Sequence, residues 1–265
     1  MRRGIALLAL ICGAAVVFVP ATAQADPAFY RAPMFGLDPA PGGALYVADA
    51  GQGIVDADTG ALMAPLPGVT DVAPIGRGDM VALTSSFAPG AHGALYRVSH
   101  GSVRKLADLQ AYEDENDPAG DGTAEGSDPF DLARLEGGKT LIADAAGNDL
   151  LVADDAGRID WVATFPAQDG IQSVPTSVVV GPDGAYYVGE LTGFPAPVGQ
   201  AAFGAGDGGG GTGGSVHGCD LSTDTCQTVV SGLPVLTSIA FRGSTLWGVT
   251  FGLVPGLADV HPLTP

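Results

Sequence analysis

Three carboxylates stand at the same place in three similar segments of the sequence. Asp49 ends GGALYVAD, Asp144 ends GGKTLIAD, and Glu190 ends DGAYYVGE. If these segments are equivalent strands of a repeated unit, their terminal side chains lie on one face of the fold. Carboxylate oxygens converging there would suit a hard cation such as Ca²⁺, which takes about 6–8 oxygen ligands. Acids at strand ends also accept hydrogen bonds from the turn that follows, and the sequence leaves both interpretations open.

Residues near the three acids complete the candidate site. The stretches that start with Asp128-Pro129 and Pro175-Thr176 precede two of the acids, and we expect them to begin strands on the same face. Asn148 follows Asp144 in the next loop. The predicted metal ligands are Asp128, Asp144 and Glu190, and the predicted ligand-binding residues are Asp49, Asn148 and Thr176. Ca²⁺ is the cofactor that this set of oxygens would take.

The densest acidic run, YEDENDPAGDGTAEGSDPFD, does not match a known calcium loop. Asp114 and Glu125 have the first-to-twelfth spacing of an EF-hand, but Pro118 and Ala119 occupy the places of a ligand and of the required glycine. The four histidines show no HExxH spacing, and there is no GxSxG elbow or Walker loop. The sequence therefore predicts no catalytic residue, and any hydrolysis would be assisted by a metal.

A repeat gives these residues their structural setting. Weaker copies of the segment are RGDMVALT, ending at Thr84, and RGSTLWGV, ending at Val249, and most copies follow another short apolar run. A unit of four short strands repeated about every 40 residues is typical of a β-propeller blade. We therefore predict an all-β propeller of five to six four-stranded blades, with long loops near residues 112–127 and 200–215. A β-sandwich is the alternative.

The N-terminus has the pattern of an export signal. Arg2 and Arg3 precede an apolar stretch, and Ala23-Gln24-Ala25 offers a small-residue cleavage site. We predict a signal peptide over residues 1–25, a propeller domain over residues 26–265, and a secreted or extracytoplasmic protein without a membrane span. The chain after residue 25 keeps 9 Lys and Arg against 29 Asp and Glu, a formal net charge of −20. Such a charge argues against nucleic acid as a partner.

Two cysteines follow the predicted signal peptide. Cys219 and Cys226 bracket a polar loop of six residues with strand-like flanks. An exported protein keeps disulfides, so we predict that the two are bonded. A metal pair is the alternative, but no CxxC or HxxxH nearby supplies further ligands.

Two segments carry a resemblance to a known family. Residues 127–166, with the run DAAGNDLL, and residues 174–199, with the run GELTGFP, resemble the ScyD/ScyE family. The resemblance implies a six-bladed propeller of NHL-like repeats, and no chemical activity is firmly attached to the family. The family pattern has Asn-Pro where this chain has Asp128-Pro129. How many blades close the ring of this chain is left open.

Two functions from different classes fit these observations. The first is an exported, non-enzymatic binding or scaffold protein that presents one propeller face to a protein or a small molecule. The second is a Ca²⁺-dependent hydrolase of the lactonase type, which shares the fold and an acidic channel mouth. The absence of catalytic motifs favours the first, while the fold itself is compatible with both.

Overall fold

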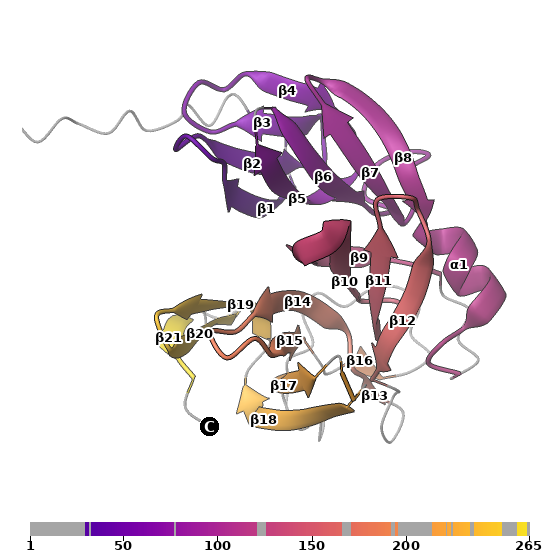
Figure 1. The fold of residues 1–265 in the computed structure, drawn as a ribbon, viewed down its shortest axis with the longest axis vertical. Coiled ribbons are helices and arrows are strands. Elements are labelled where there is room, and N and C mark those ends of the chain that lie inside the picture. The colour runs from indigo at the N-terminus through magenta and orange to yellow at the C-terminus, as the bar shows by residue number, and fades with distance from the viewer. Residues whose placement is uncertain are drawn as a thin grey trace, which may run out of the picture.

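The computed structural model describes residues 30–31, 33–76, 78–120, 126–165, 171–191, 194–195, 214–220, 222–223, 225–233, 236–250 and 259–263. The predicted signal peptide lies outside these residues, and so does most of the loop predicted near residues 200–215. In the described part the chain forms a series of small antiparallel sheets that follow one another around the molecule (Figure 1).

The first two blades are four-stranded sheets paired in chain order. Blade 1 consists of β1 (Met34–Pro39), β2 (Leu45–Asp49), β3 (Gly53–Asp56) and β4 (Leu62–Pro65). Blade 2 consists of β5 (Val69–Gly76), β6 (Asp79–Thr84), β7 (Ala94–Ser99) and β8 (Ser102–Asp108). The turn before the second strand holds a glycine with positive φ in both blades, Gly43 at 92° and Gly78 at 84°. Glycine adopts this conformation without the steric cost of a side chain, which explains the glycine in the repeated segment.

The next two blades have the same design. Blade 3 consists of β9 (Pro129–Arg134), β10 (Lys139–Asp144), β11 (Asp149–Asp154) and β12 (Ile159–Thr164), with a short 3₁₀ helix, η2 (Glu136–Gly138), before β10. Blade 4 consists of β14 (Pro175–Val180), β15 (Tyr186–Glu190), β17 (Gly214–Asp220) and β18 (Thr225–Leu233). A two-stranded sheet pairs β13 (Ile171–Gln172) with β16 (Phe194–Pro195).

Blade 5 has three strands among the described residues. They are β19 (Leu236–Arg242), β20 (Thr245–Thr250) and β21 (Asp259–Pro262). The equivalent of Asp49 in this blade is Thr250, because Leu236 pairs with Thr250 as Met34 pairs with Asp49. The sequence prediction of Val249 was wrong by one residue, since the stretch from the turn glycine to the strand end is one residue longer in this copy.

Hydrophobic cores lie between consecutive blades. In β10, Leu141 and Ala143 pack into the core shared with blade 4, whereas Ile142 packs into the core shared with blade 2. Successive side chains of a strand point to opposite faces, so a strand covered on both faces is apolar at every position. This accounts for the continuous apolar runs in the second strands.

The first strands line the inner side of the arrangement. Each contacts the first strand of the next blade, from β1 to β5, β9, β14 and β19. Inner first strands with antiparallel blades radiating from them define a β-propeller, so the predicted fold class is confirmed. The described residues contain five blade sheets, four of them with four strands.

The acidic insertion between blades 2 and 3 begins as a helix. Helix α1 (Leu109–Asn116) starts directly after β8 and lies on the outer side of the molecule (Figure 1). Asp108 caps its N-terminus, since the Asp108 side chain accepts the backbone N–H of Ala111 at 3.1 Å. The loop predicted from residue 112 is therefore helical as far as Asn116, a stretch too short for sequence periodicity to reveal.

The predicted disulfide is present. Cys219 and Cys226 are neighbours across β17 and β18, and their sulfur atoms are bonded. Among the described residues, no helix is long and apolar enough to cross a membrane.

Candidate functional site

One backbone hydrogen bond recurs at the same end of blades 1 to 4. In each, the residue after the second strand donates its N–H to the carbonyl of the residue just before the first strand. The four pairs are Ala50 to Pro33 at 2.9 Å, Ser85 to Gly68 at 2.9 Å, Ala145 to Asp128 at 3.1 Å, and Leu191 to Val174 at 2.9 Å. The strand-end positions are therefore equivalent in space, and they share one end of the propeller.

A bulge recurs at the start of the first strand. The pairing of first and second strands skips Thr70, Phe130, Thr176 and Thr237 in blades 2 to 5, and two residues, Phe35 and Gly36, in blade 1. The extra residue in a bulge makes no regular ladder hydrogen bond, and its side chain points in a different direction from that of a regular strand residue. The bulges thus determine where these side chains point at this end of the inner strands.

The carboxylate of Asp49 stabilises its own blade through three hydrogen bonds. Its carboxylate accepts the backbone N–H of Arg31 at 2.6 Å and of Gly51 at 2.9 Å, and the side-chain amide of Gln52 at 2.7 Å. A buried carboxylate with three donors is well satisfied. This side chain ties the segment before β1 to the end of β2.

Asp144 repeats this arrangement in blade 3. Its carboxylate accepts the backbone N–H of Asp128 at 2.8 Å and of Gly147 at 3.2 Å, and it also accepts a hydrogen bond from the Ser127 hydroxyl. The structure therefore brings the predicted ligands Asp128 and Asp144 together. Burial and the charge of Asp144 raise the pKa of Asp128 to about 7.

The third strand-end acid has a different partner. Glu190 lies 2.9 Å from Nε2 of His217, which is on the neighbouring strand β17 of the same blade. Among the described residues, Glu190 is not part of any group of three or more ligating side chains. The predicted set of Asp128, Asp144 and Glu190 does not form one centre.

The remaining predicted residues also connect structural elements. Asn148 accepts the backbone N–H of Val174 at 3.0 Å and donates to the Gln172 side chain, so it joins the loop after β10 to the start of blade 4. The Thr176 hydroxyl donates to the Leu236 carbonyl at 3.4 Å. Thr70 makes the equivalent bond to Pro129 at 2.8 Å. These side chains hold neighbouring blades in register.

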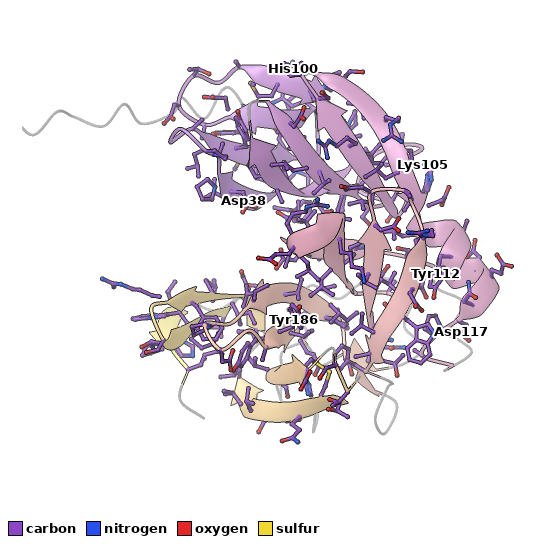
Figure 2. All side chains as sticks on the ribbon, viewed as in Figure 1. Asp38, His100, Lys105, Tyr112, Asp117 and Tyr186 are labelled. Atoms are coloured by element: carbon purple, nitrogen blue, oxygen red, sulfur yellow. A yellow bond between two sulfur atoms is a disulfide. The ribbon has the colours of Figure 1, made fainter. Side chains whose placement is uncertain are left out.

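Three carboxyls that the sequence analysis did not select lie deeper, along the inner strands. Asp71 accepts the backbone N–H of Leu132 at 3.0 Å, and Asp131 accepts that of Val178 at 2.8 Å. Asp38, on the inner side of blade 1 (Figure 2), lies beside Asp71. Burial, together with the charge of Asp131, raises the pKa of Asp38 to about 6 and that of Asp71 well above its ordinary range. Burial also raises the pKa of Asp131.

Three phenylalanines meet at the strand-end side of blades 1 to 3. Phe35 and Phe130 come from bulges in the first strands of blades 1 and 3, and Phe87 comes from the loop after β6 in blade 2. Their ring centroids are 4.5 Å apart for Phe35 and Phe87, 5.4 Å for Phe35 and Phe130, and 5.7 Å for Phe87 and Phe130. All three are only partly buried. We call this group the aromatic trio.

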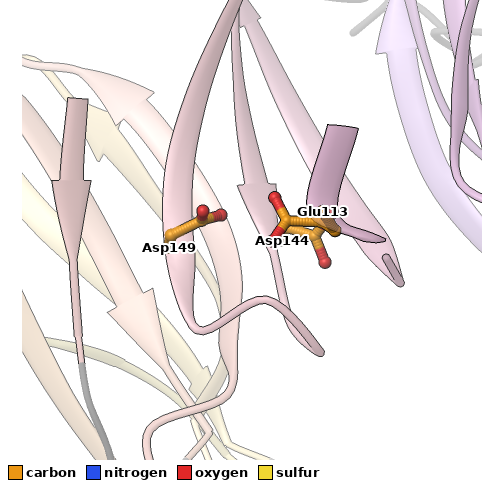
Figure 3. A group of neighbouring side chains, drawn as sticks. All are labelled: Glu113, Asp144 and Asp149. Carbon is orange, nitrogen blue, oxygen red and sulfur yellow. The ribbon is translucent and has the colours of Figure 1, made fainter. Parts of the chain in front are cut away.

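A second carboxylate group lies where helix α1 meets the ends of β10 and β11 in blade 3. Glu113 of α1, Asp144 at the end of β10 and Asp149 at the start of β11 each offer an oxygen, and these oxygens lie within 4.8 Å of one another (Figure 3). All three residues are buried. Burial and the charge of Asp144 raise the pKa of Glu113 to about 8 and that of Asp149 well above its ordinary range. We call this group the acidic cluster.

The sequence contained a signal for some of these missed residues. Asp71 and Asp131 each occupy the third position of a first strand, in VTD and PFD, where blades 4 and 5 have serine in PTS and LTS. A polar residue at a fixed place in an apolar run indicates a buried hydrogen bond. Glu113 has no such signal, because its approach to Asp149 depends on how α1 folds back.

The comparisons with known proteins bear on the fold alone. No protein-family model matches the sequence, and no curated protein is found to be similar. Among solved structures, the extracellular domain of a one-component system of B. thetaiotaomicron has a TM-score of 0.54 at 10% identity, covering 81% of this chain and 25% of that one. A chain of the nidogen/laminin complex has a TM-score of 0.54 at 11% identity, covering 82% and 72%. A gluconolactonase from Xanthomonas campestris has a TM-score of 0.54 at 15% identity, covering 82% and 69%.

These similarities support the propeller fold, but they do not show which ligand or reaction the chain is suited to. The chain spans about a quarter of the length of the B. thetaiotaomicron protein. The names of the three structures denote different kinds of protein: the extracellular domain of a one-component system, a nidogen/laminin complex and a gluconolactonase. A propeller fold hosts unrelated functions, so the site must carry the functional argument.

Proposed function

We propose that this protein is an extracytoplasmic, non-enzymatic β-propeller that binds a ligand around the aromatic trio. The observation that carries the proposal is the meeting of Phe35, Phe87 and Phe130 from three different blades. Partly exposed aromatic side chains gathered on a rigid scaffold are the usual lining of a binding site for an apolar group.

The charge of the protein indicates what else the ligand carries. The formal net charge is −20 after residue 25. A negative field attracts cations, and aromatic faces bind them as well. The ligand class that fits is an apolar or aromatic group joined to a positive charge, in a small molecule or a peptide segment. Nucleic acid does not fit this field.

The hydrolase alternative has less support from the geometry. A Ca²⁺-dependent lactonase acting at the channel mouth needs free carboxylate oxygens there. The carboxylate of Asp49 instead accepts three hydrogen bonds within its own blade, Glu190 pairs with His217, and among the described residues neither belongs to a group of three ligating side chains. We therefore favour binding over catalysis.

We further propose that the chain belongs to the ScyD/ScyE family and is exported after cleavage following Ala25, which leaves residues 26–265 as the propeller domain. The motif segments at 127–166 and 174–199 support the family. The Cys219–Cys226 disulfide supports an oxidising compartment. N-terminal sequencing of the exported protein should begin at Asp26, and an uncleaved or differently cleaved chain would contradict the predicted processing.

The binding proposal can be tested with two matched probes. Phenethylammonium and phenylacetate have similar size and carry opposite charges, and saturation-transfer NMR measures the binding of each. We expect the ammonium probe to bind more tightly than the carboxylate probe. Phe87→Ala should weaken binding of phenethylammonium about 5-fold or more, because one aromatic contact contributes on the order of 1 kcal/mol.

The control is Trp161→Ala, which removes an aromatic ring on β12 that is 52% exposed. This variant should bind phenethylammonium as the wild-type protein does. Equal binding of both probes, or binding that survives Phe87→Ala, would refute the proposed site. A panel of lactones assayed with Ca²⁺ tests the alternative, and turnover abolished by substitutions at the channel mouth would replace binding by catalysis.

A further inference from the structure

Two carboxyls of the acidic cluster, those of Asp149 and Glu113, lack partners that buried carboxylates need. Neither side-chain oxygen of Asp149 has a hydrogen-bond partner among the described residues, although the side chain is fully buried. Oε1 of Glu113 and Oδ1 of Asp128 are buried without a partner as well. Among the ion pairs of the described part of the chain, none involves Glu113, Asp144 or Asp149. Burying unpaired charge is strongly unfavourable.

Either a shared proton or a bound cation would stabilise these buried carboxylates. A proton held between Glu113 and Asp149 would join only these two carboxyls. It would not balance the charge of Asp144. A cation would be shared by the oxygens of all three residues, which lie within 4.8 Å of one another. Figure 3 shows the carboxyl of Asp149 pointing toward those of Glu113 and Asp144.

The spacing and the chemical type of the ligand atoms favour Ca²⁺ over Mg²⁺ and zinc. The ligating oxygens of the three residues all lie within 4.8 Å of one another, close enough for one Ca²⁺ ion at about 2.3–2.6 Å from each. Mg²⁺ demands a stricter octahedron and usually keeps several waters, so a site of three protein carboxylates favours Ca²⁺. Neither His nor Cys belongs to the cluster, so a zinc site is disfavoured. We propose that Glu113, Asp144 and Asp149 bind one Ca²⁺ ion.

At this position a Ca²⁺ ion would hold helix α1 against blade 3. Helix α1 has eight residues, and only Leu109 and Glu113 on it are buried. Isolated helices of this length are unstable, and α1 has little apolar surface to hold it. A Ca²⁺ ion would link Glu113 of the helix to the ends of β10 and β11 in blade 3. Asp144 also accepts hydrogen bonds from Ser127 and Asp128, so the ion would lie next to the segment that precedes β9.

This inference is independent of the proposed ligand site. The cluster is built from the insertion helix and from the loop between the second and third strands of blade 3, whereas the aromatic trio is built from bulges and a loop of blades 1 to 3. Either proposal can fail without the other.

Thermal unfolding and terbium luminescence test the site. Addition of Ca²⁺ at about 100-fold over its Kd should raise the Tm of the wild-type protein by about 5–10 °C, and EDTA should reverse the rise. Tb³⁺, a common substitute for Ca²⁺, should bind and give luminescence on excitation of Tyr112, which precedes Glu113. Mg²⁺ at the same concentration should raise the Tm less.

Two variants distinguish a metal site from a purely structural cluster. Glu113→Gln and Asp149→Asn should each abolish the Ca²⁺-dependent rise in Tm. In EDTA their Tm should equal or exceed that of the wild-type protein, because an amide replaces an unpaired buried carboxylate. The control Asp56→Asn, in an exposed turn of blade 1, should keep the full response to Ca²⁺.

Several results would overturn the inference. They are a wild-type protein that neither gains Tm with Ca²⁺ nor binds Tb³⁺, a full response in both variants, or an equal response to Mg²⁺. If Asp149→Asn does not fold, Glu113→Gln decides alone, because Glu113 lies on the insertion helix rather than in the blade core.

Discussion

The carboxylate of Asp131 accepts the backbone N–H of Val178 at 2.8 Å, which joins the first strand of blade 3 to the first strand of blade 4. Asp71 makes the same bond to Leu132 one blade earlier, at 3.0 Å. A side chain that replaces a missing ladder bond between strands fixes how neighbouring blades are positioned. The propeller is therefore held by polar contacts near its axis as well as by the apolar cores between blades.

Removal of the Asp131 carboxylate should destabilise the interface between blades 3 and 4. Asp131→Ala leaves the N–H of Val178 without an acceptor, and an unsatisfied buried donor costs about 1–3 kcal/mol. Asp131→Asn keeps an acceptor oxygen and should be close to the wild-type protein. Urea unfolding measures both, and an equal loss of stability in the two variants would show that the hydrogen bond is not the cause.

The inner carboxyls should make the protein less stable as the pH rises. Burial raises the pKa of Asp38 from 3.8 to about 6 and raises that of Asp71 well above its ordinary range. The folded state then keeps protons that the unfolded state has lost, so this contribution to stability is full below about pH 4 and is lost as the pH rises through about 6 and above.

The variant Asp71→Asn isolates this effect. It removes one carboxyl of the group and retains an acceptor for Leu132, so its Tm should decline less than the wild-type Tm between pH 5 and 8. The two proteins are compared in the same EDTA-containing buffers to exclude metal. Parallel pH profiles would contradict the shift assigned to Asp71.

A pair of glycines separates steric contact from backbone strain. Gly157 and Gly184 both have positive φ, 85° and 82°. A Cβ on Gly157 would lie 2.1 Å from the carbonyl oxygen of Leu106 in blade 2, whereas a Cβ on Gly184 would contact nothing within 4 Å. Gly184→Ala should cost about 1–2 kcal/mol from the left-handed conformation, and Gly157→Ala should cost about 1–3 kcal/mol more. Urea unfolding checks the order, and equal costs would contradict it.

The disulfide should contribute modestly to stability. It closes a short loop between β17 and β18, and a loop of this size is worth roughly 2–3 kcal/mol. Replacement of Cys219 and Cys226 together by serine should lower the free energy of unfolding by about this amount, measured in denaturant. Dithiothreitol should affect the wild-type protein and leave the double variant unchanged. A wild-type protein insensitive to the reductant would contradict the prediction.

The repeated segments predicted the fold because they combine local signals. A glycine turn followed by strand-forming residues and a polar end located β2, β10 and β15 closely, and the cysteine spacing identified the disulfide. The insertion was harder to predict. Sequence reasoning compared residues 112–131 with one known calcium loop, but helix α1 uses only Glu113 of that run and takes its partners from blade 3.

The repeat predicted which strand-end positions are equivalent, but not the contacts of their side chains. The strand-end acids are equivalent, as the repeat indicated, but the sequence could not tell which oxygens remain free. That depends on which backbone N–H groups the loops bring near. Asp144 meets three donors and Asp149, five residues later, meets none from the described residues.

The arrangement of the cores has a consequence for how the protein comes apart. Each core is shared by two consecutive blades only, so stability is transmitted along a one-dimensional series of interfaces, as in repeat proteins. A blade in the middle of the series is protected on both faces, whereas the described blades at either end are covered by one neighbour. Hydrogen exchange should therefore follow a gradient, slowest in blade 3 and fastest in blades 1 and 5, with melting that advances inward from the two ends.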